Sequence, residues 1–234
     1  MRELPLNNLN NWKTRQKPEP AELNGKFVQL THYNFDEHIA SLWEALGGEK
    51  TNELIRFFPN GPFENSTDFG TWLKEINETK EFHTMIISSV KTKEVLGMAS
   101  YMRCSPKNGS VEIGAIAHGA KMARSTLATE AHFILAKYVF EALGYRRYEW
   151  KLNNENKPSH KAAKRLGFSF EGVFRQHMVV KGKNRDTAWY SMLDNEWPLI
   201  KTAFESWLDQ SNFDKSGKQI KSLIQIRNKL AVEN

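Results

Sequence analysis

Three short segments decide the fold: VEIG at residues 111–114, ATEA at 128–131 and LGF at 166–168. The first alternates like a strand, the second opens an apolar helical stripe, and the third ends a helix at Gly167. A loop that leads from a strand into a helix presents unpaired N–H groups and the positive end of the helix dipole, which favour a phosphate group. The stretch therefore predicts strands and helices arranged around a site for an acyl-bearing phosphate cofactor.

Outward from this stretch, the hydrophobic periodicity predicts further alternating elements. Strands are expected at residues 26–30, 82–89, 95–103, 111–117, 147–152, 170–180 and 187–193. Helices are expected at residues 35–46, 69–76, 127–142, 157–166, after 198 and at 215–230. Asn156 is a good N-cap for the fourth of these helices, whose first turn tolerates Pro158. Glu130 lies off the apolar stripe of the helix at 127–142.

The composition is that of a globular protein of 234 residues with 12% aromatic and 26% charged residues. We expect an irregular lead-in at 1–20 and a basic helical C-terminal extension at 199–234. No apolar run approaches the length that spans a bilayer and the first residues lack a signal-peptide core, so we expect no membrane partner and a cytoplasmic or nuclear location. Cys104 is the only cysteine and the histidines follow no metal-binding spacing, so we expect no metal.

Much of the net charge of +6 lies between residues 145 and 165, where seven Lys or Arg residues outnumber two Glu residues. Such a cluster attracts a polyanion, either a phosphate-rich cofactor or a nucleic acid. A solvated basic face has the same composition. Both interpretations remain open at this point.

Residues 23–198 resemble a GCN5-related N-acetyltransferase (GNAT) of the ribosomal-protein N-acetyltransferase (RimJ/RimL) branch. The three segments above carry the resemblance, together with Asn156, Ser159 and the pair Glu171-Gly172. It implies an α/β (α+β) GNAT domain at 21–198, with a twisted mixed sheet of about seven strands flanked by helices and followed by the C-terminal helical extension. It also implies that acetyl-CoA lies in a V-shaped gap between the fourth and fifth strands.

The loop that would hold the pyrophosphate departs from the family pattern. Relatives usually carry Gln or Arg, two variable residues, Gly, one variable residue, and Gly or Ala, whereas this chain reads ARSTLA at 123–128. A side chain at Thr126 narrows the approach of phosphate, while the loop side chains, Lys161 and Arg165 supply donors. The resemblance implies these cofactor contacts: Ile116, Ala117, His118, Arg124, Ser125, Thr126, Leu127, Ala128, Asn156 and Lys164.

Acetyl transfer requires an amine to lose a proton and a thiolate to be stabilised. Ser159 resembles the family's hydroxyl donor near the sulfur, although it also fits an ordinary first-turn serine. Glu112 resembles the carboxylate that deprotonates the amine through water, although alternation also fits a solvent-facing carboxylate. His177 is a substitute base where some members of the branch place an acid, although a lone strand histidine is more often structural. Phe58, Phe63 and Trp72 are expected to wall the acceptor site or to belong to a core.

These residues predict an acetyl-CoA-dependent N-acetyltransferase. Its acceptor is a primary amine, either a peptide or protein N-terminus or a small molecule such as a polyamine or an aminoglycoside-like toxin. Two alternatives are a degenerate GNAT that binds acyl-CoA without catalysis and a basic RNA- or ribosome-binding module. Alternation places Tyr148 and Trp150 on one buried face, which counts against their stacking on nucleic acid. The sequence does not decide the acceptor or the oligomeric state.

Overall fold

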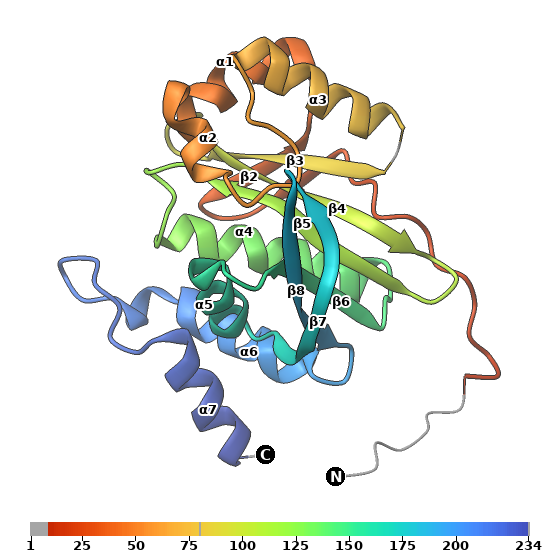
Figure 1. Ribbon diagram of the computed structural model, residues 1–234. Coiled ribbons are helices and arrows are strands. Elements are labelled where there is room, and N and C mark those ends of the chain that lie inside the picture. Colours follow the sequence, from red (N-terminus) through yellow and green to blue (C-terminus); the bar gives the residue numbers. More distant parts are fainter. Residues whose placement is uncertain (1–8, 80, 234) are drawn as a thin grey trace.

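The computed structural model describes residues 9–79 and 81–233; the first eight residues of the expected lead-in lie outside this part. One sheet has the strand order β1-β2-β3-β4-β5-β6-β8-β7 (Figure 1). The strands are β1 (Glu22–Asn24), β2 (Val28–His32), β3 (Phe82–Ser89), β4 (Val95–Ser105), β5 (Ser110–His118), β6 (Arg147–Asn153), β7 (Ser169–Val180) and β8 (Lys183–Leu193). The sheet thus has eight strands rather than about seven, because the three residues of β1 are too few to give a periodic signal.

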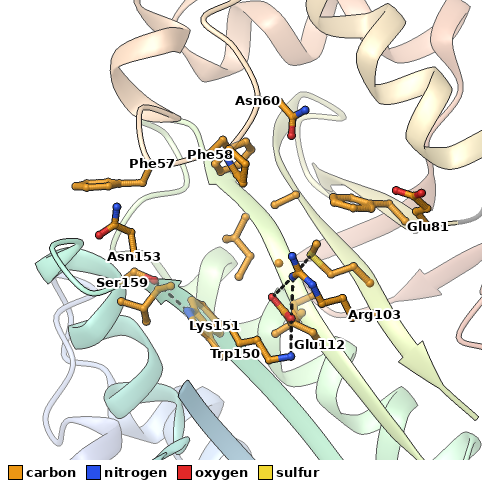
Figure 2. Close-up of a pocket in the computed structure, with 18 of the residues that line it drawn as sticks. Phe57, Phe58, Asn60, Glu81, Arg103, Glu112, Trp150, Lys151, Asn153 and Ser159 are labelled. Atoms are coloured by element: carbon orange, nitrogen blue, oxygen red, sulfur yellow. Dashed lines mark hydrogen bonds and ion pairs between the residues drawn. The ribbon is translucent and has the colours of Figure 1, made fainter. Parts of the chain in front are cut away.

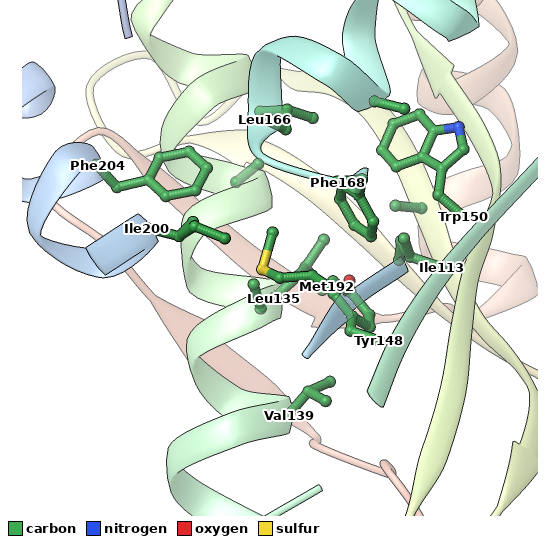
Figure 3. Packing of buried hydrophobic residues seen from close by; sticks show 14 of the residues in the cluster. Ile113, Leu135, Val139, Tyr148, Trp150, Leu166, Phe168, Met192, Ile200 and Phe204 are labelled. Atoms are coloured by element: carbon green, nitrogen blue, oxygen red, sulfur yellow. The ribbon is translucent and has the colours of Figure 1, made fainter. Parts of the chain in front are cut away.

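Helices cover both faces of this sheet. They are α1 (Phe35–Leu46), α2 (Thr51–Leu54), α3 (Ser66–Glu78), α4 (Thr126–Lys137), α5 (Lys157–Leu166), α6 (Trp197–Leu208) and α7 (Leu223–Glu233). In the view of Figure 1, α1 to α3 lie above the sheet and α4 to α7 below it. Successive side chains of β3 point to opposite faces of the sheet. Met85 and Ile87 belong to the core around α4, whereas Ile86 belongs to the core around α1 and α3. Figure 3 shows Leu135 and Val139 of α4 in the larger core.

The sheet opens between β5 and β6, the one parallel pair among the described strands. These strands pair only from Ser110 to Glu112 with Arg147 to Glu149. Beyond that point β6 stays paired with β8, while β5 stays paired with β4 through a bulge at which Ala115 has a φ of 45°. The bulge turns β5 away from β6. Ligands of α/β proteins commonly bind at such openings beyond the carboxyl ends of parallel strands.

The helix that follows β6 forms as its local sequence predicts. Asn156 Oδ1 accepts a hydrogen bond from the main-chain N–H of Ser159 at 3.2 Å, Pro158 lies in the first turn, and Gly167 ends the helix with a left-handed φ of 106°. Asn156 and Ser159, at the start of this helix, lie beside the opening between β5 and β6.

Glu130 of α4 is buried rather than solvated, contrary to its position off the apolar stripe. Only 5% of this residue is exposed, and its carboxylate accepts hydrogen bonds from the N–H groups of Lys26 at 2.9 Å, Phe27 at 2.6 Å and Val28 at 2.8 Å. A Cβ on Gly25 would lie 2.7 Å from Glu130 Oε2, so the turn needs glycine there. This carboxylate fixes the turn between β1 and β2 to the main helix.

Both terminal segments pack on the central sheet and helices. Residues 9–20 lack helix and strand, as expected, yet Trp12 Nε1 donates to Lys107 O at 2.7 Å and Tyr145 Oη donates to Gln16 O at 2.8 Å. At the other end, Phe204 of α6 stacks on Phe133 of α4 at 5.3 Å. The helix expected at 215–230 forms only from 223, and before it Phe213 pairs with Gln219 in an isolated bridge.

Candidate active site

A cavity of about 540 Å³ occupies the opening between β5 and β6 (Figure 2). Phe57, Phe58 and Trp72 lie on the side of α2 and α3, and Met178 and Arg185 come from the hairpin of β7 and β8. Its other described lining residues are Lys17, Pro59, Asn60, Glu81, Phe82, Met102, Arg103, Cys104, Glu112, Ile113, Gly114, Ala115, Ile116, Trp150, Lys151, Leu152, Asn153, Asn156 and Ser159. We call this space the strand-gap cavity.

Ser159 reaches the strand-gap cavity from the first turn of α5. Its Oγ accepts a hydrogen bond from Trp150 Nε1 at 2.9 Å, and the described residues offer no acceptor for its own proton. The indole N–H therefore orients the hydroxyl and leaves the O–H free to donate to a ligand in the cavity. A hydroxyl placed in this way can stabilise negative charge that develops on a ligand atom during a reaction.

Glu112 lies at the centre of a charged network on the floor of the same cavity. Arg103 Nη1 lies 3.0 Å from both carboxylate oxygens, and Lys151 Nζ lies 3.1 Å from one of them (Figure 2). Only 2% of Glu112 is exposed, so the solvent-facing interpretation is wrong. Lys151 also pairs with Glu149 at 2.7 Å and lies 3.9 Å from the ring of Trp189. Arg103 and Lys151 thus share the Glu112 carboxylate, which holds both side chains at the cavity floor.

A second cavity, of about 860 Å³, lies between the N-termini of α4 and α5 and the segment after α6. We call it the cationic cavity, because five cations and no carboxylate are among the described residues that line it. Those cations are Arg124, Lys157, Lys161, Arg165 and Lys218. Trp207 and Phe213 add aromatic walls. Positive side chains beside two helix N-termini fit a polyanion such as a diphosphate.

The loop before α4 is closed by its own side chains. Ser125 Oγ accepts a hydrogen bond from the N–H of Ala128 at 3.3 Å and donates one to Met122 O at 2.6 Å. Arg165 Nη2 donates to Thr129 Oγ1 at 3.0 Å, and its guanidinium lies 5.0 Å from the ring of Trp207. Thr126, which occupies the family's glycine position, is the first residue of the helix. Side chains thus partly replace the glycine-rich backbone of relatives.

Two histidines line the inner end of the cationic cavity with their rings 5.2 Å apart. Burial lowers the pKa of His118 to about 4. Burial also lowers the pKa of His132, and the nearby His118 and Arg165 lower it further. The Nε2 atom of each ring is buried without a hydrogen-bond partner among the described residues. Both rings are therefore neutral at pH 7 and can hydrogen-bond with a ligand.

This pair makes stability depend on pH. A histidine whose pKa is lower in the folded state than the unfolded value near 6.5 binds fewer protons when folded, so stability is lost as the pH falls from about 6.5 to about 4. Between pH 7.5 and pH 4.5, we expect the wild type to lose about 2 kcal/mol more of its free energy of unfolding than the His118→Asn variant loses. Urea unfolding of the ligand-free protein at both values measures this, with His177→Asn at an exposed histidine as the control. Equal losses in His118→Asn and wild type would contradict it.

The structure brings together most of the residues that the sequence singled out. Glu112, Ile116, Asn156 and Ser159 line the strand-gap cavity with Phe58 and Trp72. The cationic cavity contains His118, Arg124, Ser125, Thr126 and Ala128. The two sets adjoin at the start of α5, where Asn156 and Ser159 line the strand-gap cavity and Lys157 and Pro158 line the cationic cavity.

Other expected site residues line neither cavity. Ala117 and Phe63 are 2% and 7% exposed in the core under α1 and α3, and Leu127 packs against the larger core. Lys164 is exposed, on a side of α5 away from the cavities. His177 is exposed, with Nδ1 3.0 Å from Thr187 Oγ1. Ala117 and His177 lie on β5 and β7, whose bulges shift the alternation of their side chains.

Several lining residues were not identified as site residues from the sequence: Lys17, Arg103, Lys151, Arg185, Trp207 and Lys218. Arg103 has a left-handed φ of 45° in an irregular part of β4, which no local pattern predicts. Arg185 belongs to an expected strand region, but only the hairpin geometry brings it to the cavity. Lys151 could have been predicted from the sequence, because a parallel pairing of β5 with β6 places this residue near Glu112.

Within residues 9–79 and 81–233, no group of three or more His, Cys, Asp or Glu side chains is placed to hold a metal ion. No helix of that part has both the length and the apolar character needed to cross a membrane.

Comparisons with known proteins agree with this architecture. A family model described as an acetyltransferase (GNAT) domain matches residues 31–169. A crystal structure of a GCN5-related N-acetyltransferase from Brucella melitensis is 43% identical, with a TM-score of 0.89, and the match covers 93% of this chain and 99% of that one. A structure from Chromobacterium violaceum, described as a probable acetyltransferase of the GNAT family, is 37% identical, with a TM-score of 0.76 over 82% of this chain and 96% of its own.

A curated relative, an uncharacterized N-acetyltransferase of Bacillus licheniformis, is 28% identical over 148 residues, or 62% of this chain and 83% of that protein. The split sheet, the main helix behind it and the match of the family model lead to the same assignment. The chain belongs to the GNAT family of acetyltransferases.

Proposed function

We propose that this enzyme transfers the acetyl group of acetyl-CoA to a primary amine. One observation carries the proposal: the first turns of α5 contribute side chains to both the cationic cavity and the strand-gap cavity. A donor with phosphates at one end and a thioester at the other can extend past this helix from one cavity to the other. The Nε2 atoms of His118 and His132, which have no hydrogen-bond partner among the described residues, belong to the cationic cavity.

The cationic cavity has the chemistry that the phosphate end of the donor requires. Lys157 and Lys161 extend from the first turns of α5, and Arg165 crosses to Thr129 of α4. Charge-assisted hydrogen bonds from such groups are stronger than neutral ones. They compensate for the missing glycine at Thr126, so the altered loop is compatible with donor binding.

At the other end, the amine attacks the thioester carbonyl and a thiolate leaves. Ser159 is the proposed donor to that thiolate, since Trp150 already holds its oxygen and leaves its proton free. Glu112 is proposed as a positioning residue that holds Arg103 and Lys151 at the cavity floor. Arg185, which also lines the cavity and forms no ion pair with the described residues, favours the neutral form of a bound amine, because like charges disfavour the ammonium form. The amine can therefore lose its proton to water at the mouth of the cavity.

The competing role as an RNA- or ribosome-binding module finds little support in these positions. The aromatic residues within the basic stretch, Tyr145, Tyr148 and Trp150, are 1%, 1% and 4% exposed, so they cannot stack on bases without local unfolding. The basic side chains of α5 instead surround a concave cavity.

Calorimetric titration with acetyl-CoA at low ionic strength, followed by a thiol-release screen over peptides and small amines, tests the function. We expect binding heat and thiol release with at least one amine. Binding without thiol release across the screen would favour a degenerate GNAT. No heat with acetyl-CoA, CoA or another acyl-CoA would refute donor binding altogether.

Ser159→Ala should lower the turnover number at least tenfold, because the thiolate loses its hydrogen-bond donor. The dissociation constant of acetyl-CoA should change less than twofold. Ser159→Thr, which restores a hydroxyl, should recover part of the rate, and Ser206→Ala on the exposed side of α6 is the matched control. Thiol-release kinetics and calorimetry separate the two quantities; an unchanged turnover number in Ser159→Ala would remove this residue from the mechanism.

A further inference from the structure

The acceptor side of the strand-gap cavity carries an excess of positive charge. Four cations line the cavity, against the carboxylates of Glu81 and Glu112. Glu112 is already shared by Arg103 and Lys151, and the described residues place no carboxylate within 4 Å of Arg185 or Lys17. The cavity therefore contains positive charge that the described side chains do not neutralise.

Arg185 is the most informative of these cations. It extends from β8 in the hairpin that forms one wall, and its Nε is buried without a hydrogen-bond partner among the described residues. Burial lowers its pKa and the neighbouring Arg103 lowers it further, partly opposed by Glu112, but a guanidinium stays protonated in proteins. A buried N–H without an acceptor costs free energy that a ligand oxygen would recover.

Arg103 supplies a second donor beside it. Its Nη1 is held by both oxygens of Glu112, while no described residue accepts a hydrogen bond from its Nε or Nη2. Nearly half of its side chain, 48%, is exposed. Arginine forks bind planar carboxylates in a bidentate manner, and the two arginines together offer several unused N–H donors on the wall of the cavity.

We propose that the acceptor of this enzyme is a primary amine that also carries a carboxylate, and that Arg185, with Arg103 beside it, binds that carboxylate. This inference rests on the proposed function and narrows it. Polyamines and aminoglycosides are polycations, and uncompensated arginines repel them. A carboxylate held here leaves the amine of the same molecule free to reach the thioester near Ser159.

Two sources provide this chemistry: a free amino acid, with its own carboxylate, and a peptide whose N-terminal region carries an acidic side chain. Matched pairs of ligands distinguish them. One arm compares free amino acids covering the twenty side chains with their amides. The other compares C-terminally amidated tetrapeptides that differ only by Glu or Gln at the second position. Spermidine and kanamycin represent the polycationic acceptors.

Binding is measured by calorimetry with CoA present, and thiol release with acetyl-CoA is measured in parallel. In the wild type we expect the carboxylate form of at least one pair to bind tenfold or more tightly than its uncharged partner. Arg185→Gln should reduce that difference to less than twofold. Lys183→Gln, which removes an exposed cation from the same hairpin, should leave it unchanged, and the thermal unfolding midpoint verifies that both variants fold.

The outcomes separate this inference from the function on which it rests. Absence of thiol release with every acceptor would count against the proposed function, while the binding data would still decide the carboxylate site. The inference would be overturned if thiol release were no faster with free amino acids than with their amides and no faster with the Glu peptides than with the Gln peptides. It would also be overturned if thiol release were fastest with spermidine or kanamycin. The acetyltransferase function would stand in both cases. A preference that persists in Arg185→Gln would overturn the role of Arg185.

Discussion

Replacing Glu130 with alanine is expected to lower the free energy of unfolding by about 4 kcal/mol, because one buried and two partly buried main-chain N–H groups lose a charged acceptor. These groups belong to Lys26, Phe27 and Val28 in the turn that leads into β2. Urea unfolding at pH 7 measures the change.

Two further variants define the origin of this effect. Glu130→Gln keeps one acceptor oxygen but turns an amide N–H₂ toward a main-chain donor, so we expect about half the loss. Lys137→Ala, at an exposed position of the same helix, should change the stability by less than about 0.5 kcal/mol. A loss below about 1 kcal/mol in Glu130→Ala would show that the turn finds other partners.

The double variant Lys157→Gln and Lys161→Gln should raise the dissociation constant of acetyl-CoA about 100-fold at low ionic strength, the effect of losing two charge-assisted hydrogen bonds. Both residues line the cationic cavity from the first turns of α5. Because both side chains are exposed, the effect should shrink as salt is added. Calorimetric titration at two salt concentrations measures both trends.

Lys164→Gln is the matched control for this pair. Lys164 lies on the same helix and carries the same charge, but it does not line the cavity. We expect its removal to change the dissociation constant less than twofold. If Lys164→Gln weakened binding as much as the double variant, general attraction by the basic helix would explain donor binding better than the cavity does.

Local signals predicted much of the fold. Helix α1 begins and ends where its apolar periodicity does, at Phe35 and Leu46. Helix α5 has the predicted N-cap at Asn156 and the predicted glycine end at Gly167. Capping and periodicity depend on residues a few positions apart, so they can be read from one segment of the chain.

Features that depend on pairing between distant segments could not be predicted in this way. The burial of Glu130 depends on a turn about a hundred residues earlier, and β1 exists only because β2 pairs with it. The same holds for the site. Ser159 and Asn156 were found through a local motif, whereas Arg103 and Arg185 lie about eighty residues apart and meet only through the bulged strands and the hairpin.

Helix α5 bears on how this enzyme can change over time. It is ten residues long and carries Ser159 for one cavity and Lys157 and Lys161 for the other. A regular helix advances about 1.5 Å per residue. Helix α5 therefore fixes the distance from Ser159 to Lys157 and Lys161. Arg185 and the aromatic residues opposite stand on separate elements. Under the proposed function, changes in the hairpin of β7 and β8 would alter the choice of amine without altering the helix that sets the distance between the two ends of the donor site.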